Sequence, residues 1–123
     1  MRVIKFRAWH LNLNEFLKDG FSISQDGLFL YDDNLNEWEI DPNFVIEQYT
    51  GLKDKNGVEI YEGDVIRGNL YEWDLPTMGC IIYDSEHSTF ANKNDGGITF
   101  LFRINKISVI GNIRENPELI END

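Results

Sequence analysis

The stretch that decides the fold reads Gln48-Tyr-Thr-Gly-Leu-Lys-Asp-Lys-Asn-Gly-Val-Glu-Ile-Tyr-Glu-Gly-Asp-Val-Ile-Arg67. It places two short apolar arms, Tyr49 to Leu52 and Val58 to Tyr61, on either side of a polar connection. Asn56-Gly57 in that connection tolerates the positive φ of a tight turn, so the arms are expected to pair as a β-hairpin. Asp64 then opens a further strand.

The chain after this hairpin is rich in strand-forming residues. β-Branched and aromatic side chains occur at strand-like length in Asp64 to Tyr71, Gly79 to Asp84, Ile98 to Ile104 and Ile107 to Ile113. Several short strands of this kind are typical of a small barrel or sandwich. The loop Glu86 to Gly97 is the most polar segment, and we expect it to be the most mobile.

A β-meander is predicted before the hairpin. Phe21 to Ile23 and Leu28 to Leu30 flank Asp26-Gly27 with period-two alternation, and Glu37 to Ile40 returns after Asp32-Asp33-Asn34. The predicted fold is therefore mainly β and antiparallel. It has an N-terminal meander region over residues 1–47 and a second region over 48–123, whose small barrel ends near residue 114. The two regions can pack as one domain.

Helical signals are few. Asp41-Pro42 and Asn116-Pro117 each pair a good N-cap residue with proline at the first helical position, and the second predicts one short helical turn near the C-terminus. The segment Trp9 to Lys18 stays open between helix and loop. Arg2 to Trp9 is expected to pair with the C-terminal strand, because both end segments are apolar and would otherwise expose strand edges.

The composition describes a folded but acidic chain. Its 123 residues are 41% hydrophobic, which favours a single folded domain, and 22 acids against 11 bases give a net charge of −11. No Lys or Arg occurs from Asp19 to Leu52. This acidic segment argues against binding of nucleic acid or anionic membranes. A solvated surface is its simpler interpretation, and mimicry of nucleic-acid phosphates is the alternative. Its acids are Asp19, Asp26, Asp32, Asp33, Glu37, Glu39, Asp41 and Glu47.

The single cysteine favours a reducing compartment. Cys80 cannot form an internal disulfide and lies in the apolar run Gly79 to Tyr83, so it is expected to be a buried small hydrophobe. No apolar run approaches the roughly 20 residues of a membrane span, and the charged start does not match a signal peptide. We therefore expect a cytoplasmic protein.

The candidate metal ligands do not form a recognisable set. His10, Cys80 and His87 lack the paired spacing of zinc sites. Asp32, Asn34 and Asn36 match the first, third and fifth positions of an EF-hand loop, but Glu37 stands where that loop needs glycine. An Asx-rich turn explains them better, so we predict no metal and no cofactor.

Paired carboxylates for acid–base catalysis could come from Asp54, Glu59, Glu62 and Asp64. Backbone N–H groups of neighbouring turns explain acids at positions 54 and 64 equally well. The sequence contains no Gly-rich phosphate loop, serine nucleophile elbow or Cys/His pair. We therefore predict a protein that is not an enzyme.

Aromatic residues are the remaining candidates for a functional role. Most of them are expected in the core, but Trp38 and Trp73 each lie between acidic neighbours and can project from a polar rim. These two tryptophans are the candidate residues for contact with a partner or a second subunit.

Three blocks of this sequence resemble the signature blocks of the YopX family: Arg2 to Trp9, Gln48 to Val65 and Val109 to Leu119. His10 stands where the family usually has an acid, and Arg114 stands where an aromatic is common. The resemblance implies a mainly β, cytoplasmic protein encoded by a bacteriophage or prophage. The family has no established molecular role, so no catalytic residue can be transferred.

The central block also resembles, more loosely, the entry to an SH3-like barrel at Glu62 to Val65. We expect the residues of the central block to act structurally, in turns, strand entry and packing. They are Tyr49, Thr50, Gly51, Leu52, Asp54, Asn56, Gly57, Ile60, Tyr61, Gly63 and Asp64.

These observations leave three functional hypotheses in order. The first is a non-enzymatic phage or prophage accessory protein of the bacterial cytoplasm, which acts through contact with an unknown protein partner or through self-assembly as a homo-oligomer. The second is an acidic inhibitor that mimics nucleic acid and occupies a host protein. The third is a metal-assisted hydrolase that uses Asp54, Glu59 or Asp64.

Overall fold

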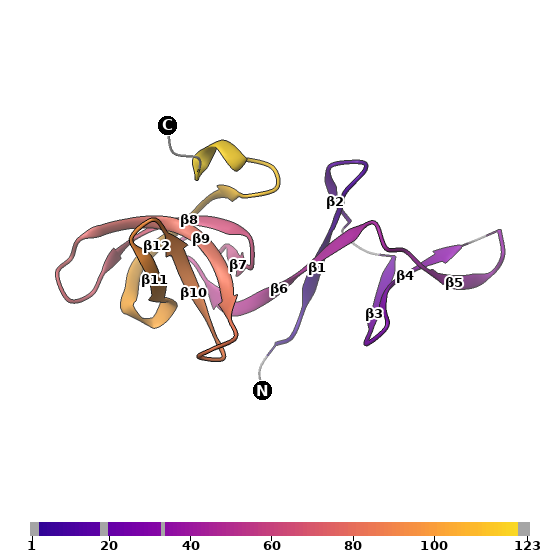
Figure 1. The fold of residues 1–123 in the computed structure, drawn as a ribbon, viewed down its shortest axis with the longest axis horizontal. Coiled ribbons are helices and arrows are strands. Elements are labelled where there is room, and N and C mark those ends of the chain that lie inside the picture. Colours follow the sequence, from indigo (N-terminus) through magenta and orange to yellow (C-terminus); the bar gives the residue numbers. More distant parts are fainter. Residues whose placement is uncertain (1–2, 18–19, 33, 121–123) are drawn as a thin grey trace. The chain divides into compact units, whose positions relative to one another are not determined.

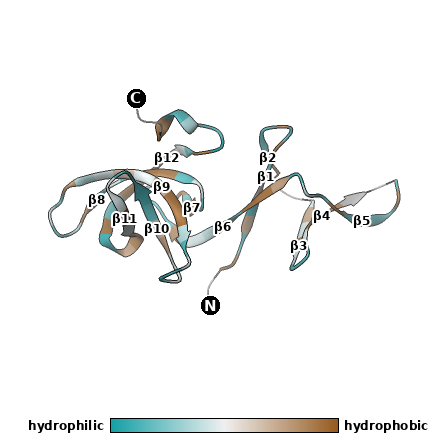
Figure 2. Cartoon of the chain, in the orientation of Figure 1, coloured by the Kyte–Doolittle hydropathy of each residue, from teal (hydrophilic) through white to brown (hydrophobic). Residues whose placement is uncertain are grey.

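The computed structural model describes residues 3–17, 20–32 and 34–120 (Figure 1). Antiparallel strands dominate, so the prediction of a mainly β fold is confirmed. The chain divides into two compact units. Residues 6–47 form the N-terminal unit, and residues 48–123 with residues 1–5 form the C-terminal unit. Figure 2 shows hydrophobic and hydrophilic residues interspersed along the strands of both units, as expected for strands with one buried face.

The N-terminal unit contains the predicted meander. Strands β3 (Phe21–Ser24), β4 (Gly27–Asp32) and β5 (Glu37–Ile40) pair antiparallel in that order. Phe21 faces Leu30 and Ile23 faces Leu28, so the apolar residues of the first hairpin lie opposite one another. Because the side-chain period in a strand is two, this register puts all four on the same face.

The segment Trp9 to Lys18, which the sequence left open between helix and loop, is neither: its described residues belong to another hairpin. Strands β1 (Phe6–His10) and β2 (Glu15–Leu17) pair antiparallel, and Lys18 lies outside the described residues. The His10 Nδ1 atom accepts the N–H groups of Asn12 and Leu13, at 3.1 and 3.0 Å, and so stabilises the turn. Buried Trp9 contacts the Phe16 ring edge-to-face at 4.8 Å between centroids.

The predicted pairing of Arg2 to Trp9 with the C-terminal strand is wrong. β1 lies between β2 and β6 (Phe44–Lys53), whereas β12 (Ile104–Asn112) pairs with β8 (Asp64–Leu70). The Arg7 Nε atom donates to the Glu47 Oε1 atom at 2.9 Å, which gives the β1–β6 pair a charge-assisted hydrogen bond. Apolar character alone could not distinguish between the two possible partners of β1.

The C-terminal unit begins with the hairpin of the central block. β6 pairs antiparallel with β7 (Glu59–Tyr61), as the sequence predicts. A five-stranded sheet follows in the order β11-β10-β9-β8-β12, in which β9 spans Pro76–Asp84, β10 spans Thr89–Asn94 and β11 spans Gly97–Phe100. All of its pairs are antiparallel. The likeness to an SH3-like barrel stays a prediction.

The expectation of a polar loop over Glu86 to Gly97 is wrong, because half of this segment is β10 and Gly97 begins β11. The strand lies between β9 and β11 and forms backbone pairs with both. Ala91 and Asn92 in it are fully buried. Hydrogen bonding to two neighbouring strands therefore overrides the low strand propensity of its Asn and Lys residues.

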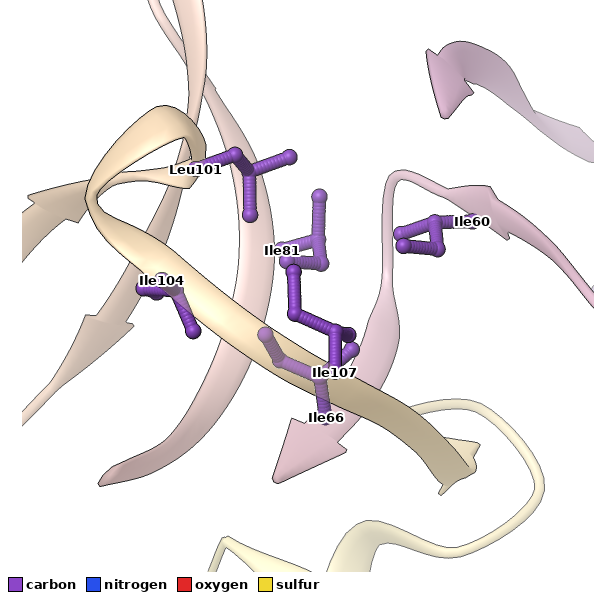
Figure 3. Close-up of a cluster of buried hydrophobic side chains, with 6 residues drawn as sticks. All are labelled: Ile60, Ile66, Ile81, Leu101, Ile104 and Ile107. Atoms are coloured by element: carbon purple, nitrogen blue, oxygen red, sulfur yellow. The ribbon is translucent and has the colours of Figure 1, made fainter. Parts of the chain in front are cut away.

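The core of the C-terminal unit is aliphatic, and Figure 3 shows its six buried members. They come from β7, β8, β9, β12 and the 3-10 helix η1 (Leu101–Arg103). They are Ile60, Ile66, Ile81, Leu101, Ile104 and Ile107. The helix η1 interrupts the predicted strand Ile98 to Ile104: it buries Leu101 and leaves Phe102 69% exposed.

The predicted helical turn near the C-terminus is confirmed as the single 3-10 turn η2 (Pro117–Leu119). Asn116 does not cap it through its side chain; instead its Oδ1 atom accepts the Asn112 N–H at 3.3 Å. Asp41 starts no helix, since its Oδ1 atom accepts the Asn43 N–H at 2.8 Å just before β6. Asp41 therefore forms an Asx turn, whereas Asn116 accepts an N–H group four residues before it.

Candidate functional site

The central block is organised around the carboxylate of Asp54. Its Oδ1 atom accepts the N–H groups of Asn56 and Val58 at 2.8 and 2.9 Å, and its Oδ2 atom accepts the Val109 N–H at 2.9 Å. Burial alone would raise the pKa of this carboxyl, but the three backbone donors outweigh burial and hold the pKa below its ordinary value. Asp54, which is only 8% exposed, thus connects the β6–β7 turn to β12.

The other three carboxylates considered for catalysis also have local partners. Asp64, 2% exposed, accepts the Tyr61 N–H at 2.8 Å and the Asn112 side-chain amide at 3.3 Å. Glu62 accepts the Gln48 N–H at 2.7 Å. Glu59 pairs with Lys5, and this hydrogen bond raises the pKa of the Lys5 ammonium group.

These contacts give the four carboxylates no common reaction site. Asp54 borders one hollow of the surface and Glu62 borders a different one. A pair for general acid–base catalysis needs two groups with separated pKa values at one cleft. The geometry instead fits a structural role, in which carboxylates accept hydrogen bonds from backbone N–H groups.

The remaining central-block residues shape and pack the hairpin. Gly51, Gly57 and Gly63 have φ values of 89°, 84° and 85°, which side chains with a Cβ atom rarely adopt. Thr50 Oγ1 donates to the Ile60 carbonyl at 2.7 Å. The rings of Tyr49 and Tyr61, which are paired across β6 and β7, lie 5.5 Å apart. Ile60 is fully buried, whereas Leu52 is 47% exposed and Asn56 is exposed.

His10 belongs to the N-terminal unit, whereas Cys80 and His87 belong to the C-terminal unit. His10 caps a turn in the N-terminal unit, and the buried Cys80 Sγ atom lies 3.7 Å from the Ile81 carbonyl oxygen. His87 Nδ1 lies 2.7 Å from Asp84 Oδ2. Of the EF-hand-like residues, Asp32 ends β4 and pairs with Glu37 of β5, and Asn34 and Asn36 lie in the turn between these strands.

One group of possible metal ligands was not anticipated from the sequence. Asp84, Glu86 and His87 lie in the β9–β10 turn, and one donor atom from each falls within 4.8 Å of the others. The Asp84 carboxylate also accepts the Glu86 N–H at 3.2 Å and contacts His87, so the turn itself accounts for the cluster. The only sequence feature that could have indicated this group is the spacing of its three residues at positions i, i+2 and i+3.

An aromatic groove is the most distinctive surface of the C-terminal unit. We use this name for a cavity of about 450 Å³ whose walls come from the β8–β9 turn on one side and from β11 with η1 on the other. Tyr71, Trp73, Ile98 and Phe102 on these walls are between 50% and 69% exposed. The main residues that line it are Tyr71, Trp73, Ile98, Phe100, Phe102 and Arg103.

Two of the aromatic rings in the groove contact each other, and a backbone hydrogen bond connects its walls. Phe100 and Phe102 stack at 5.6 Å between centroids, and the Arg103 guanidinium lies 6.0 Å from the Phe102 ring centre. The Tyr71 N–H donates to the Arg103 carbonyl at 2.9 Å and so joins the two walls. Large apolar side chains that are exposed together and rimmed by polar groups mark interaction surfaces rather than core.

Basic residues concentrate beside this groove. A second hollow of about 390 Å³ shares Tyr71 and Phe102 with the groove and is bordered by Lys53, Lys55 and Lys106. We call it the basic hollow. With Arg103, four of the chain's 11 basic residues border the two cavities, against the acids Asp54 and Glu72. This part of the surface therefore departs from the acidic character of the chain.

The two tryptophans predicted as contact residues lie in different units. Trp73 is 66% exposed in the aromatic groove, and Trp38 is 50% exposed in β5. The sequence analysis did not single out Tyr71 or Phe102 as partners of Trp73. Phe102 lay inside a predicted strand, and only knowledge of the 3-10 turn would have placed its ring outside the core.

Only some acidic side chains of the acidic segment are exposed. Glu37 and Glu39 in β5 are exposed, whereas Glu47 is 3% exposed and paired with Arg7. Asp19 and Asp33 lie outside the described residues. The helices that the structure describes are all too short and too polar to cross a membrane.

Comparisons with known proteins show what this chain is similar to. The family model described as YopX protein matches residues 5–121. The chain is similar to the crystal structure of protein EF1440 from Enterococcus faecalis, with 29% identity, a TM-score of 0.54, and coverage of 98% of this chain and 100% of the other.

A second similar structure is protein yopX from Bacillus subtilis, with 18% identity, a TM-score of 0.58, and coverage of 100% of this chain and 99% of the other. Comparison with curated proteins found no match. Because the family model spans nearly the whole chain, the resemblance of its three sequence blocks is confirmed: this protein belongs to the YopX family.

Proposed function

We propose that this YopX-family protein acts without catalysis, as a protein-interaction module that associates with copies of itself through the aromatic groove. In this proposal it is an accessory protein of a bacteriophage or prophage and works in the cytoplasm of the bacterial host. The observation that carries the proposal is the groove itself, where Trp73, Phe102 and Tyr71 are each more than 60% exposed. Exposing such rings to water is unfavourable in an isolated chain, and burial in an interface recovers that free energy.

The residue composition of the groove also supports a protein partner. Aromatic residues with a neighbouring arginine are the side chains enriched in protein interfaces. The carboxylates considered for catalysis are engaged with backbone N–H groups or with Lys5, which makes association a better account of the surface than hydrolysis.

Light scattering tests this proposal directly. The wild-type protein is expected to scatter as an oligomer whose mass falls on dilution, and Trp73→Ala is expected to shift it toward the monomer. Tyr83→Ala serves as the matched control, because Tyr83 is an aromatic of the same unit, 46% exposed, that does not line the groove. A wild-type protein that stays monomeric at every concentration, or a Trp73→Ala variant with wild-type mass, would contradict the proposal.

Inhibition by mimicry of nucleic acid is the second candidate. Glu37 and Glu39 support it because side chains two residues apart in a strand point the same way, and both are exposed. The buried, paired Glu47 does not contribute to such a surface. Binding of a basic host protein that weakens steeply with salt and is lost in Glu37→Gln/Glu39→Gln would favour this candidate, whereas salt-independent binding would remove it.

A further inference from the structure

The C-terminal unit has a strand edge beside the aromatic groove. In the sheet order β11-β10-β9-β8-β12, strand β11 is terminal, and among the described strands it pairs only with β10. Its residues Ile98, Thr99 and Phe100 form one wall of the groove. A terminal strand presents backbone N–H and C=O groups on its outer side, and an added strand can pair with them.

The N-terminal unit has a strand suited to that edge. β5 is the last strand in the order β3-β4-β5, and it is four residues long, as β11 is. All four of its residues are exposed. Trp38 and Ile40, 50% and 55% exposed, alternate with Glu37 and Glu39, so one face of β5 is apolar and the other is acidic.

The basic hollow beside the groove is opposite in charge to β5, although Glu72 lines the groove together with Arg103, and Asp74 Oδ1 lies 4.0 Å from Lys106 Nζ. Arg103 in the groove and Lys53, Lys55 and Lys106 in the basic hollow lie around the proposed acceptor. Glu37 and Glu39 belong to the proposed donor, which lies in the segment from Asp19 to Leu52 that has no Lys or Arg. Opposite potentials speed the encounter of two proteins and disfavour wrong partners.

We propose that β5 of one copy of this chain adds to the β11 edge of a second copy, with Trp38 bound in the aromatic groove. This inference rests on the proposed self-association and specifies its two surfaces. Main-chain pairing between four-residue strands supplies register, and Trp38 supplies the apolar anchor. Because donor and acceptor are different surfaces, a reciprocal dimer, a ring and a filament can all be built from this one contact.

Complementation between two variants tests the inference. The donor variant, Trp38→Ala/Ile40→Ser, lacks the apolar face of β5 but keeps the groove. The acceptor variant, Trp73→Ala/Phe102→Ala, lacks the groove but keeps β5. All four side chains are at least half exposed, so both variants should keep the wild-type circular dichroism spectrum and melting temperature.

Each variant alone should associate about 30-fold or more weakly than wild type, the loss expected for a buried aromatic anchor. An equimolar mixture should form pairs with one copy of each, because the intact β5 of the acceptor variant meets the intact groove of the donor variant. Sedimentation velocity with one variant fluorescently labelled measures this directly.

Different results of this experiment would contradict different parts of the proposal. If wild type is monomeric at all concentrations, both the proposed self-association and this inference fail. If wild type associates but the acceptor variant alone retains its mass, the groove is not the interface, and both the proposed function and this inference fail. If only the donor variant retains its mass, or the mixture forms no mixed pairs, the β5–β11 contact is wrong while self-association through the groove stands. The Tyr83→Ala control should behave as wild type throughout.

Discussion

Replacing Asp54 with alanine should destabilise the C-terminal unit more than any other single change to an acidic residue considered above. The substitution removes the acceptor of three backbone N–H groups, from Asn56, Val58 and Val109. After the loss of the carboxylate, water can reach the exposed turn donors of Asn56 and Val58, but the half-buried Val109 N–H is left without its partner.

The size of the effect follows from these three bonds. Hydrogen bonds to a charged group contribute about 1.5–3 kcal/mol each, and those that water can replace contribute less. Counting about 2 kcal/mol for Val109 and about 1 kcal/mol for the two turn donors together gives a loss of about 3 kcal/mol. For a unit of this size that corresponds to a fall in melting temperature of roughly 12–24 °C.

Calorimetry and urea unfolding monitored by circular dichroism measure this loss. Asp54→Asn is a matched variant: its carbonyl oxygen can keep the two turn bonds, but its NH₂ group faces the Val109 N–H, so it should lose about 2 kcal/mol. Asp26→Asn, at an exposed turn, controls for the loss of an acidic residue. A loss below about 1 kcal/mol in Asp54→Ala would refute the view that this carboxylate holds the turn on β12.

Further predictions concern pH, packing and charge. The folded pKa of Asp54 lies below its ordinary value. The stability that the ionised Asp54 carboxylate contributes is therefore fully present above about pH 4 and is lost as pH falls through the folded pKa. Acid unfolding curves should show this loss of stability in wild type and lack it in Asp54→Asn. Gly79→Ala should cost about 1–3 kcal/mol in urea unfolding, because the new Cβ atom would lie 2.5 Å from both Asn92 Oδ1 and the Lys93 carbonyl oxygen; wild-type stability would contradict this packing. Glu59→Gln should leave the melting temperature nearly unchanged, since its pair with Lys5 is solvent-accessible, and a large fall would show that the pair is structurally important.

Local chemistry explains the parts of the fold that could be predicted. The hairpin of β3 and β4 follows from apolar alternation around Asp26-Gly27, and the hairpin of β6 and β7 follows from the turn at Asn56-Gly57. Both are decided by residues within a few positions of each other. The single C-terminal 3-10 turn likewise follows from Pro117 and its neighbours.

The parts that could not be predicted depend on contacts distant in sequence. β10 exists because β9 and β11 pair with its two edges, although its own side chains are largely polar. β1 pairs with β6 rather than β12, and the Arg7–Glu47 contact across this pair joins residues 40 positions apart. The period-two pattern of a single segment carries no information about such partners.

For the candidate site too, local features could be predicted from the sequence, whereas contacts distant in sequence could not. Trp73 could be selected from its acidic neighbours, but the groove also needs Tyr71, Ile98 and Phe102, which come from three different segments: the β8–β9 turn, β11 and η1. The local role of Asp54 in its turn could be anticipated, whereas its bond to Val109, 55 positions away, could not.

Hydrogen–deuterium exchange at low and high protein concentration tests the central claim most directly. The account predicts that concentrating the wild-type protein slows exchange at residues 97–103, where β11 and η1 border the aromatic groove, and at 37–40 in β5. The donor and acceptor variants should each abolish this concentration-dependent protection. Exchange at these residues that is independent of concentration, or protection confined to other strands, would contradict the account.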